Sequence, residues 1–225
     1  RERRGTARRA GALLAQLHLE FDDGTSRTVI SDPSWRVTTG PESEADLLFG
    51  ESYDATRELG RWSETGYDDQ AWDAAVEAST NKRAKAYFQD RGGRRAVEIG
   101  FVKPRVLAGY DAPPVRLIEE RRAIEVRDSR PGFHVFDFGQ NLTGNVRLKA
   151  TGMKKGQKLT LRYGVDAKDF AASRKRDFGA TDSYVCKGTD SESWTPRFTI
   201  HTFRFVEIEG LTAKPGPDLL RGLVI

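Results

Sequence analysis

Cysteine is nearly absent from this chain of 225 residues, because Cys186 is the only one. A single cysteine cannot form an internal disulfide, and it excludes a metal site built from several thiolates. Long apolar runs are also missing, so no segment reaches the length that spans a bilayer, and none near the start resembles a secretory signal. We expect a soluble protein without a membrane partner, and the compartment stays unknown.

The net charge of +4 is concentrated at one end of the chain. The first nine residues hold five arginines against Glu2, which is already +4, so the remainder is neutral. A nucleic-acid-binding domain carries its basic residues on a folded face, whereas a short Arg-rich end is typical of a solvated terminus. We therefore expect no nucleic-acid partner. Because the chain begins with Arg1 rather than Met, we interpret its start as a cut end.

Motifs of several catalytic classes are missing as well. The sequence has no phosphate-binding glycine-rich loop of the P-loop or Rossmann type and no nucleophile elbow. The three histidines, His18, His134 and His201, follow no zinc-binding spacing. Nucleotide chemistry, serine-hydrolase chemistry and a metal site are therefore not predicted.

Short β patterns dominate what is present. Leu17, Leu19 and Phe21 share one side of an alternating segment, and turn residues 22–25 lead into a partner strand at 27–30. Later alternating segments lie at 133–138, 145–150, 159–163 and 202–209. Many short antiparallel strands separated by turns favour a sandwich over an α/β sheet.

Two prolines mark the expected domain boundary. Pro113 and Pro114 each fix their own φ and restrict the preceding residue, which makes a stiff extended segment. We predict an all-β protein of two consecutive antiparallel β-sandwich, jelly-roll-like domains, over residues 1–112 and 113–225.

One short helix is predicted near residues 68–78. Asp68 and Asp69 are placed as an N-cap with a favourable dipole interaction, and Trp72 and Val76 lie four residues apart on one helical face.

Five ordered blocks resemble the bacterial α-L-rhamnosidase family of glycoside hydrolases. The blocks lie at residues 15–35, 49–72, 113–120, 136–144 and 180–207, and include a Gly-Glu-x-Tyr-Asp-Ala pattern at 50–55 and a Phe-Asp-Phe-Gly-Gln-Asn pattern at 136–141. Any single block is weak, but the ordered set covers nearly the whole chain. The resemblance implies a carbohydrate-binding-module-like front domain followed by a concanavalin-like β-sandwich.

The family's catalytic carboxylates belong to an (α/α)6 barrel that follows these sandwiches. Because the chain ends at Ile225, about where the linker to that barrel would begin, we expect the barrel to be missing and predict no catalytic residue here. The parent reaction implied is hydrolysis of terminal non-reducing α-L-rhamnose. The predicted role is to scaffold a barrel supplied in cis or in trans, or to contact rhamnose-containing glycans. The alternative is a stand-alone carbohydrate-binding or structural interface protein.

Calcium is the cofactor that the resemblance raises. The family's front module can resemble a calcium-dependent rhamnose-binding module, whose oxygen ligands include an Asp-Asn type pair directly before the Gly-Glu. Here that pair is Leu48 and Phe49, and neither side chain can ligate calcium. We therefore predict no cofactor.

A metal-free sugar site would combine an aromatic plane with charged groups for the hydroxyls. Residues of these types are available in the matching blocks: Trp72, Tyr53, Glu51, Asp54 and Arg57. The structural interpretation is favoured, in which the aromatics fill the core while Asp54 and Arg57 form pairs or cap turns. Asp137, Gln140 and Asn141 are likewise interpreted as a structural hydrogen-bonded corner beside Gly139 and Gly144.

Overall fold

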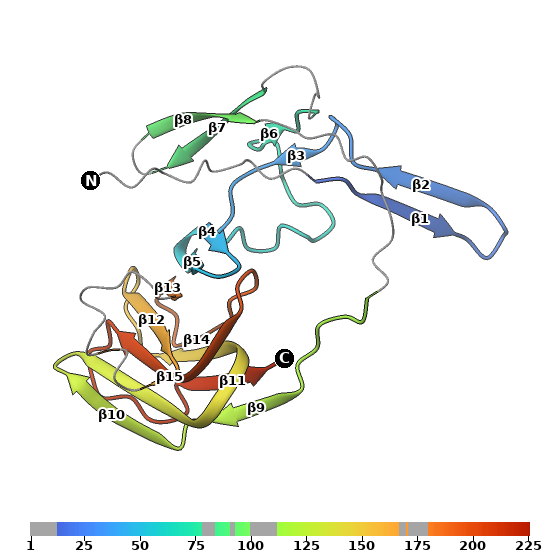
Figure 1. Cartoon of the computed structure of the whole chain (residues 1–225). Coiled ribbons are helices and arrows are strands. Elements are labelled where there is room, and N and C mark those ends of the chain that lie inside the picture. The colour runs from blue at the N-terminus through green and yellow to red at the C-terminus, as the bar shows by residue number, and fades with distance from the viewer. Residues whose placement is uncertain (1–12, 78–83, 91–92, 100–111, 167–169, 171–179) are drawn as a thin grey trace. The chain divides into compact units, whose positions relative to one another are not determined.

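The computed structural model describes residues 13–77, 84–90, 93–99, 112–166, 170 and 180–225 (Figure 1). The chain divides into two compact units. The first unit contains Arg1–Thr39 and Arg61–Asp111, and the second contains Gly40–Gly60 and Ala112–Ile225. The regular structure is almost entirely β, which confirms the predicted fold class.

The described part of the first unit consists of antiparallel strand pairs. They are β1 (Gln16–Glu20) with β2 (Ser26–Ile30), β3 (Arg36–Val37) with β6 (Asp73–Ala74), and β7 (Ala84–Asp90) with β8 (Gly93–Ile99). The β1–β2 hairpin is the one predicted, with Gln16 opposite Ile30. Its turn uses Gly24 at φ 81°, and the Asp23 carboxylate accepts the amide proton of Thr25.

The helix predicted near residues 68–78 is wrong. Asp68 caps a local turn by accepting the amide proton of Gln70, and the Trp72 amide donates to the carbonyl of Asp69. The chain then becomes extended, because β6 pairs with β3. Strand pairing and side-chain capping therefore outweigh a helical pattern that is only about three turns long.

The second unit contains one continuous sheet that folds over itself. Its elements are β4 (Glu42–Asp46), β5 (Gly50–Asp54), η1 (Ala55–Arg57), β9 (Glu119–Arg122), β10 (Glu125–Arg130), β11 (Phe133–Thr151), β12 (Lys158–Gly164), β13 (Thr181–Val185), β14 (Ser191–Trp194), β15 (His201–Glu209) and β16 (Leu220–Val224). The strand order is β4-β5-β13-β12-β15-β11-β16-β9, with β10 and β14 also paired to β11. All pairs are antiparallel except β5 with β13.

The long strand β11 joins the two layers of this sandwich and bends around the second unit (Figure 1). Its first half pairs with β10 and β15, and its second half pairs with β14 and β16. Alternate residues of β11, including Phe136, Val146 and Leu148, face a core shared with Leu161 and Ile208. Burying each such side chain contributes about 1.5–3 kcal/mol, so this core is the main stabilising element of the unit.

The hairpin β4–β5 belongs to the second unit, although in sequence it lies between the first unit's strands β3 and β6. A linear division after residue 112 places residues 40–60 in the first domain, whereas their packing places them with Ala112–Ile225. The domain division at 112 and 113 itself stays a prediction. In sequence, residues 61–111 are therefore inserted between the two segments of the second unit.

Candidate functional site

Two of the blocks noted in the sequence meet in a buried polar cluster of the second unit. Strand β5 supplies Glu51, β13 supplies Asp182, and β15 supplies His201. Strand β12 adds Tyr163. The parallel pairing of β5 with β13 and the antiparallel pairing of β13 with β12 bring these residues together from distant parts of the chain.

Asp182 is the centre of this cluster and is completely buried. Its Oδ1 accepts the Glu51 amide proton at 2.8 Å, while its Oδ2 accepts the Tyr163 hydroxyl and lies 3.1 Å from Nε2 of His201. The His201 ring stacks on Tyr163 with centroids 3.9 Å apart. Burial, followed by the Asp182 charge, raises the pKa of Tyr163, so this hydroxyl stays protonated and donates to Asp182.

Glu51 is the second buried carboxyl group of the cluster, with 1% of its surface exposed. Its Oε2 accepts the backbone amides of Arg197 and Phe198, both at 2.9 Å. Its Oε1 has no hydrogen-bond partner among the described residues. Burial raises the pKa of Glu51, and the nearby Asp182 charge acts in the same direction.

Only glycine fits directly before Glu51. Gly50 has φ 109°, and a Cβ atom there would lie 2.2 Å from the carbonyl oxygen of Thr181. The Gly-Glu pair of the motif therefore reflects close backbone approach between β5 and β13.

The residues predicted for a metal-free sugar site are not gathered into one site within either unit. Glu51 is buried in the cluster, and Tyr53 is half-buried and stacks on Tyr184 at 5.8 Å. Asp54 caps η1 by accepting from the amide and hydroxyl of Thr56, and Arg57 lies in the last turn of η1. The capping role of Asp54 agrees with its structural interpretation, and the assignment of these residues to a sugar site stays a prediction.

Trp72 lies in the first unit. Its partly buried ring packs against Tyr67, with centroids 5.6 Å apart. The Arg36 guanidinium donates to the Trp72 carbonyl and lies 3.8 Å from Asp69. Its role in a sugar site stays a prediction.

Residues 47–49 form the turn of the β4–β5 hairpin, where the family's calcium ligands were expected. The Asp46 carboxylate accepts the amides of Leu48 and Phe49, and both apolar side chains are about two-thirds exposed. The Asp46 carboxylate already accepts two hydrogen bonds, and the side chains of Leu48 and Phe49 offer no oxygen ligand. These residues therefore do not fit a calcium ion.

Of the three residues predicted to form a hydrogen-bonded corner, Asp137 does so, whereas Gln140 and Asn141 are exposed. Asp137 accepts two hydrogen bonds from Arg204 at 2.9 Å and one from the Gly139 amide at 2.7 Å. The Arg204 hydrogen bonds lower the pKa of Asp137 more than partial burial raises it. The register of β11 against β15 shifts at this point, between Asp137 and Leu142.

The three histidines are bound to different partners. His18 contacts Thr28, His134 contacts Asp128, and His201 contacts Asp182. Within the described ranges no group of three His, Cys, Asp or Glu residues could hold a metal ion. In the same part of the chain, no helix has the length and apolar character needed to cross a membrane.

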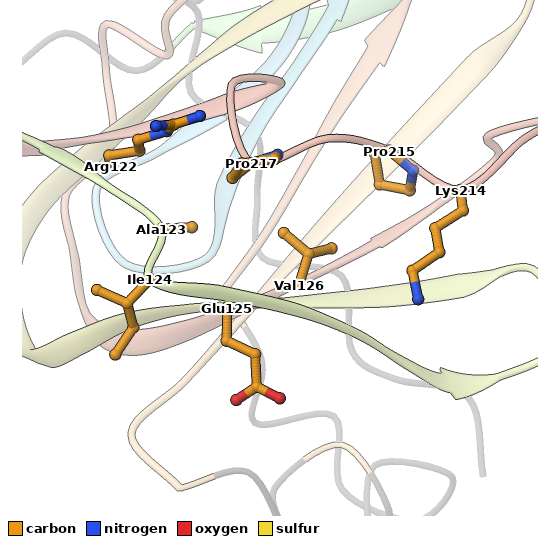
Figure 2. A pocket seen from close by; sticks show the side chains of 8 residues that line it. All are labelled: Arg122, Ala123, Ile124, Glu125, Val126, Lys214, Pro215 and Pro217. Atoms are coloured by element: carbon orange, nitrogen blue, oxygen red, sulfur yellow. The ribbon is translucent and has the colours of Figure 1, made fainter.

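A surface hollow of about 630 Å³ lies between the β9–β10 turn and residues 214–217 (Figure 2). Ile124, Val126 and two prolines supply its apolar lining. Both basic side chains that line it have acidic partners, since Arg122 pairs with Asp218 at 2.9 Å and Lys214 lies 3.7 Å from Asp128. We therefore assign no ligand to this hollow.

Comparison with known families matches both halves of the chain. Residues 1–97 match the α-L-rhamnosidase N-terminal domain, and residues 127–225 match the bacterial α-L-rhamnosidase concanavalin-like domain. The chain belongs to the α-L-rhamnosidase family. The buried Glu51 and Asp182 thus lie in rhamnosidase motifs, one from each of these domains.

Relatives support this membership along nearly the whole chain. An α-L-rhamnosidase of Streptomyces avermitilis is 38% identical over 95% of this chain, which corresponds to 19% of the relative. Its crystal structure with L-rhamnose superimposes with a TM-score of 0.73 at 36% identity, over 94% of this chain. The α-L-rhamnosidase structure from Dictyoglumus thermophilum gives a TM-score of 0.75 at 31% identity, and 22% of it is covered. The chain spans about a fifth of the length of these relatives.

Proposed function

We propose that this chain is the non-catalytic β-sandwich part of an α-L-rhamnosidase and scaffolds a catalytic (α/α)6 domain joined to it in cis. The observation that supports this role is the state of its buried carboxyl groups. Asp182, Glu207 and Glu51 are at most 1% exposed and bind the chain's own donors. Glycoside hydrolysis needs two carboxyl groups that flank a bound sugar, and buried groups cannot do so.

The first test is an activity assay of the 225-residue chain on an aryl α-L-rhamnoside. We expect release of the aryl alcohol no faster than with heat-denatured protein, because the buried carboxyl groups of Asp182, Glu207 and Glu51 cannot flank a bound sugar. Turnover that is lost on denaturation would show that the chain is catalytic by itself.

The scaffolding role is tested by a chimaera with the Streptomyces avermitilis enzyme. Its front segment, the part aligned with this chain, is either deleted or replaced by the present sequence. We expect the deletion to abolish soluble activity and the replacement to restore it to within about tenfold, since 38% identity preserves the sandwich core. A chimaera no more active than the deletion would contradict the scaffold.

Contact with a rhamnose-containing glycan is a second candidate, favoured by the partly exposed ring of Trp72. An aromatic face stacks on the apolar face of a sugar ring, and Trp72→Ala would remove it. If the site exists, calorimetric titration with L-rhamnose should give millimolar binding that Trp72→Ala weakens at least tenfold and that calcium does not alter. If L-rhamnose gives no heat of binding in the calorimeter and changes no amide chemical shift, this candidate is eliminated.

A further inference from the structure

The β4–β5 hairpin is attached to the sandwich by hydrogen bonds that converge on two buried carboxyl groups. The Glu51 amide donates to Asp182, and the Glu51 carboxylate accepts the amides of Arg197 and Phe198. On either side of these bonds, the Thr181 amide donates to the Phe49 carbonyl and the Ile200 amide donates to the Leu47 carbonyl. Opening the hairpin breaks all of these bonds together.

The attachment is unusual in its charge. Two carboxyl groups, Glu51 and Asp182, are buried in the same cluster, close enough for their charges to interact, and no Lys or Arg side chain forms an ion pair with either of them among the described residues. The titratable groups that face them are Glu42 from β4, Tyr163 from β12 and His201 from β15. Two buried carboxylates without a Lys or Arg partner are costly when both are charged, and binding one proton at the pair lowers that cost.

We propose that the Glu51–Asp182 pair makes the β4–β5 hairpin a pH-sensitive clasp, which holds the sandwich firmly when the pair carries a proton and loosens when that proton leaves. The unpartnered Oε1 of Glu51 is the position where the proton is least opposed by hydrogen bonds, since Oε2 accepts two amides.

The direction of the effect follows from the pKa of Glu51, which burial raises above its ordinary value of 4.5. A carboxyl group with a higher pKa in the closed state than in the open state stabilises the closed state at low pH. This stabilisation is complete below about pH 4.5, the open-state value, and it is lost as the pH rises through the closed-state pKa.

The rest of the sandwich has the opposite dependence, which makes the clasp distinguishable. The pKa of Asp137 and that of Glu192 are both lowered, so their contributions are present at neutral pH and are lost in acid. Acid therefore weakens the unit as a whole while it tightens the hairpin.

Amide hydrogen exchange of the 225-residue chain between pH 4.5 and 8 tests the proposal. The reporters are the amides of Glu51, Arg197, Phe198, Thr181 and Ile200, corrected for intrinsic exchange at each pH. We expect their opening constant to rise with pH by up to about tenfold per unit, the limit for one proton, and then to level off. Reference amides in the β12–β15 pairing, such as those of Leu161 and Ile208, should not follow this rise.

Two variants separate the clasp from a general effect. Glu51→Gln keeps the side-chain volume but removes the titratable carboxyl group. It should therefore make the opening constant of the reporter amides independent of pH. Glu44→Gln, on the exposed β4, should leave the wild-type dependence unchanged. The clasp is overturned if the opening constants of the reporter amides in the wild type do not change with pH, or if they change in parallel with those of the reference amides. This measurement is made on the wild type, so it decides even if Glu51→Gln does not fold.

Discussion

Residues 113–225 produced alone are expected not to fold, although they match the predicted second domain. This piece lacks the β4–β5 hairpin, so Asp182 loses the Glu51 amide and the cluster opens to water. Tyr184 and Trp194 lose the ring of Tyr53, which lies 5.8 and 6.0 Å from them. Leaving a buried polar group without its partner costs about 1–3 kcal/mol, and more when the group is charged. The lost packing adds to this, so the total is comparable to the roughly 5 kcal/mol at the low end of a domain's stability.

The matched control restores the hairpin without the first unit. In it, Arg61–Asp111 is replaced by a Gly/Ser linker of about 20 residues, so that Gly40–Gly60 stays connected to Ala112–Ile225. We expect this protein to give a cooperative urea transition and a dispersed amide spectrum, while 113–225 gives neither. Equal, cooperative folding of both would show that the hairpin is dispensable.

The sequence predicts strands well where alternation or turn chemistry is strong. The β1–β2 hairpin and the extended segments of β11, β12 and β15 follow their alternating patterns. The helix near 68–78 fails because a short acidic start suits an Asp-capped turn as well as a helix N-terminus. Local pattern cannot choose between these outcomes, and the choice is made by pairing of β6 with β3.

The buried cluster shows what sequence reasoning cannot reach without long-range contacts. Glu51 could be selected as a polar residue in a motif, but its partner Asp182 lies 131 residues later, and Tyr163 carries no motif signal at all. The signal that could have found the cluster is an acidic residue within each of two strand-like segments, Glu51 in Gly50–Asp54 and Asp182 in Thr181–Val185. Both contain a carboxyl group between residues that alternate like a strand, which is typical of an inward-facing polar group.

Glu192→Ala is expected to destabilise the second unit by about 4 kcal/mol at pH 7. The Glu192 side chain is almost fully buried and accepts four hydrogen bonds. They come from the Tyr184 hydroxyl and the amides of Lys187, Gly188 and Thr189, at 2.8 to 3.2 Å. Alanine leaves these donors without a partner, and each unsatisfied buried donor costs about 1–3 kcal/mol, reduced where water enters.

The effect of this substitution should shrink in acid. Burial raises the pKa of Glu192, but four hydrogen bonds together lower it by a larger amount, to below 4.5. They come from the Lys187 amide, the Tyr184 hydroxyl and the amides of Gly188 and Thr189. A carboxyl group with a lowered folded-state pKa stabilises the fold above its unfolded pKa, and this contribution is lost as the pH falls through the folded-state value. Urea unfolding from pH 7 to 3.5 should therefore show the free energies of unfolding of the wild type and of Glu192→Ala converging below about pH 4.5.

Glu125→Ala, at an exposed position, is the control and should differ from the wild type by less than about 0.5 kcal/mol throughout. A constant gap between wild type and Glu192→Ala would mean that the loss comes from packing rather than from the carboxylate's hydrogen bonds.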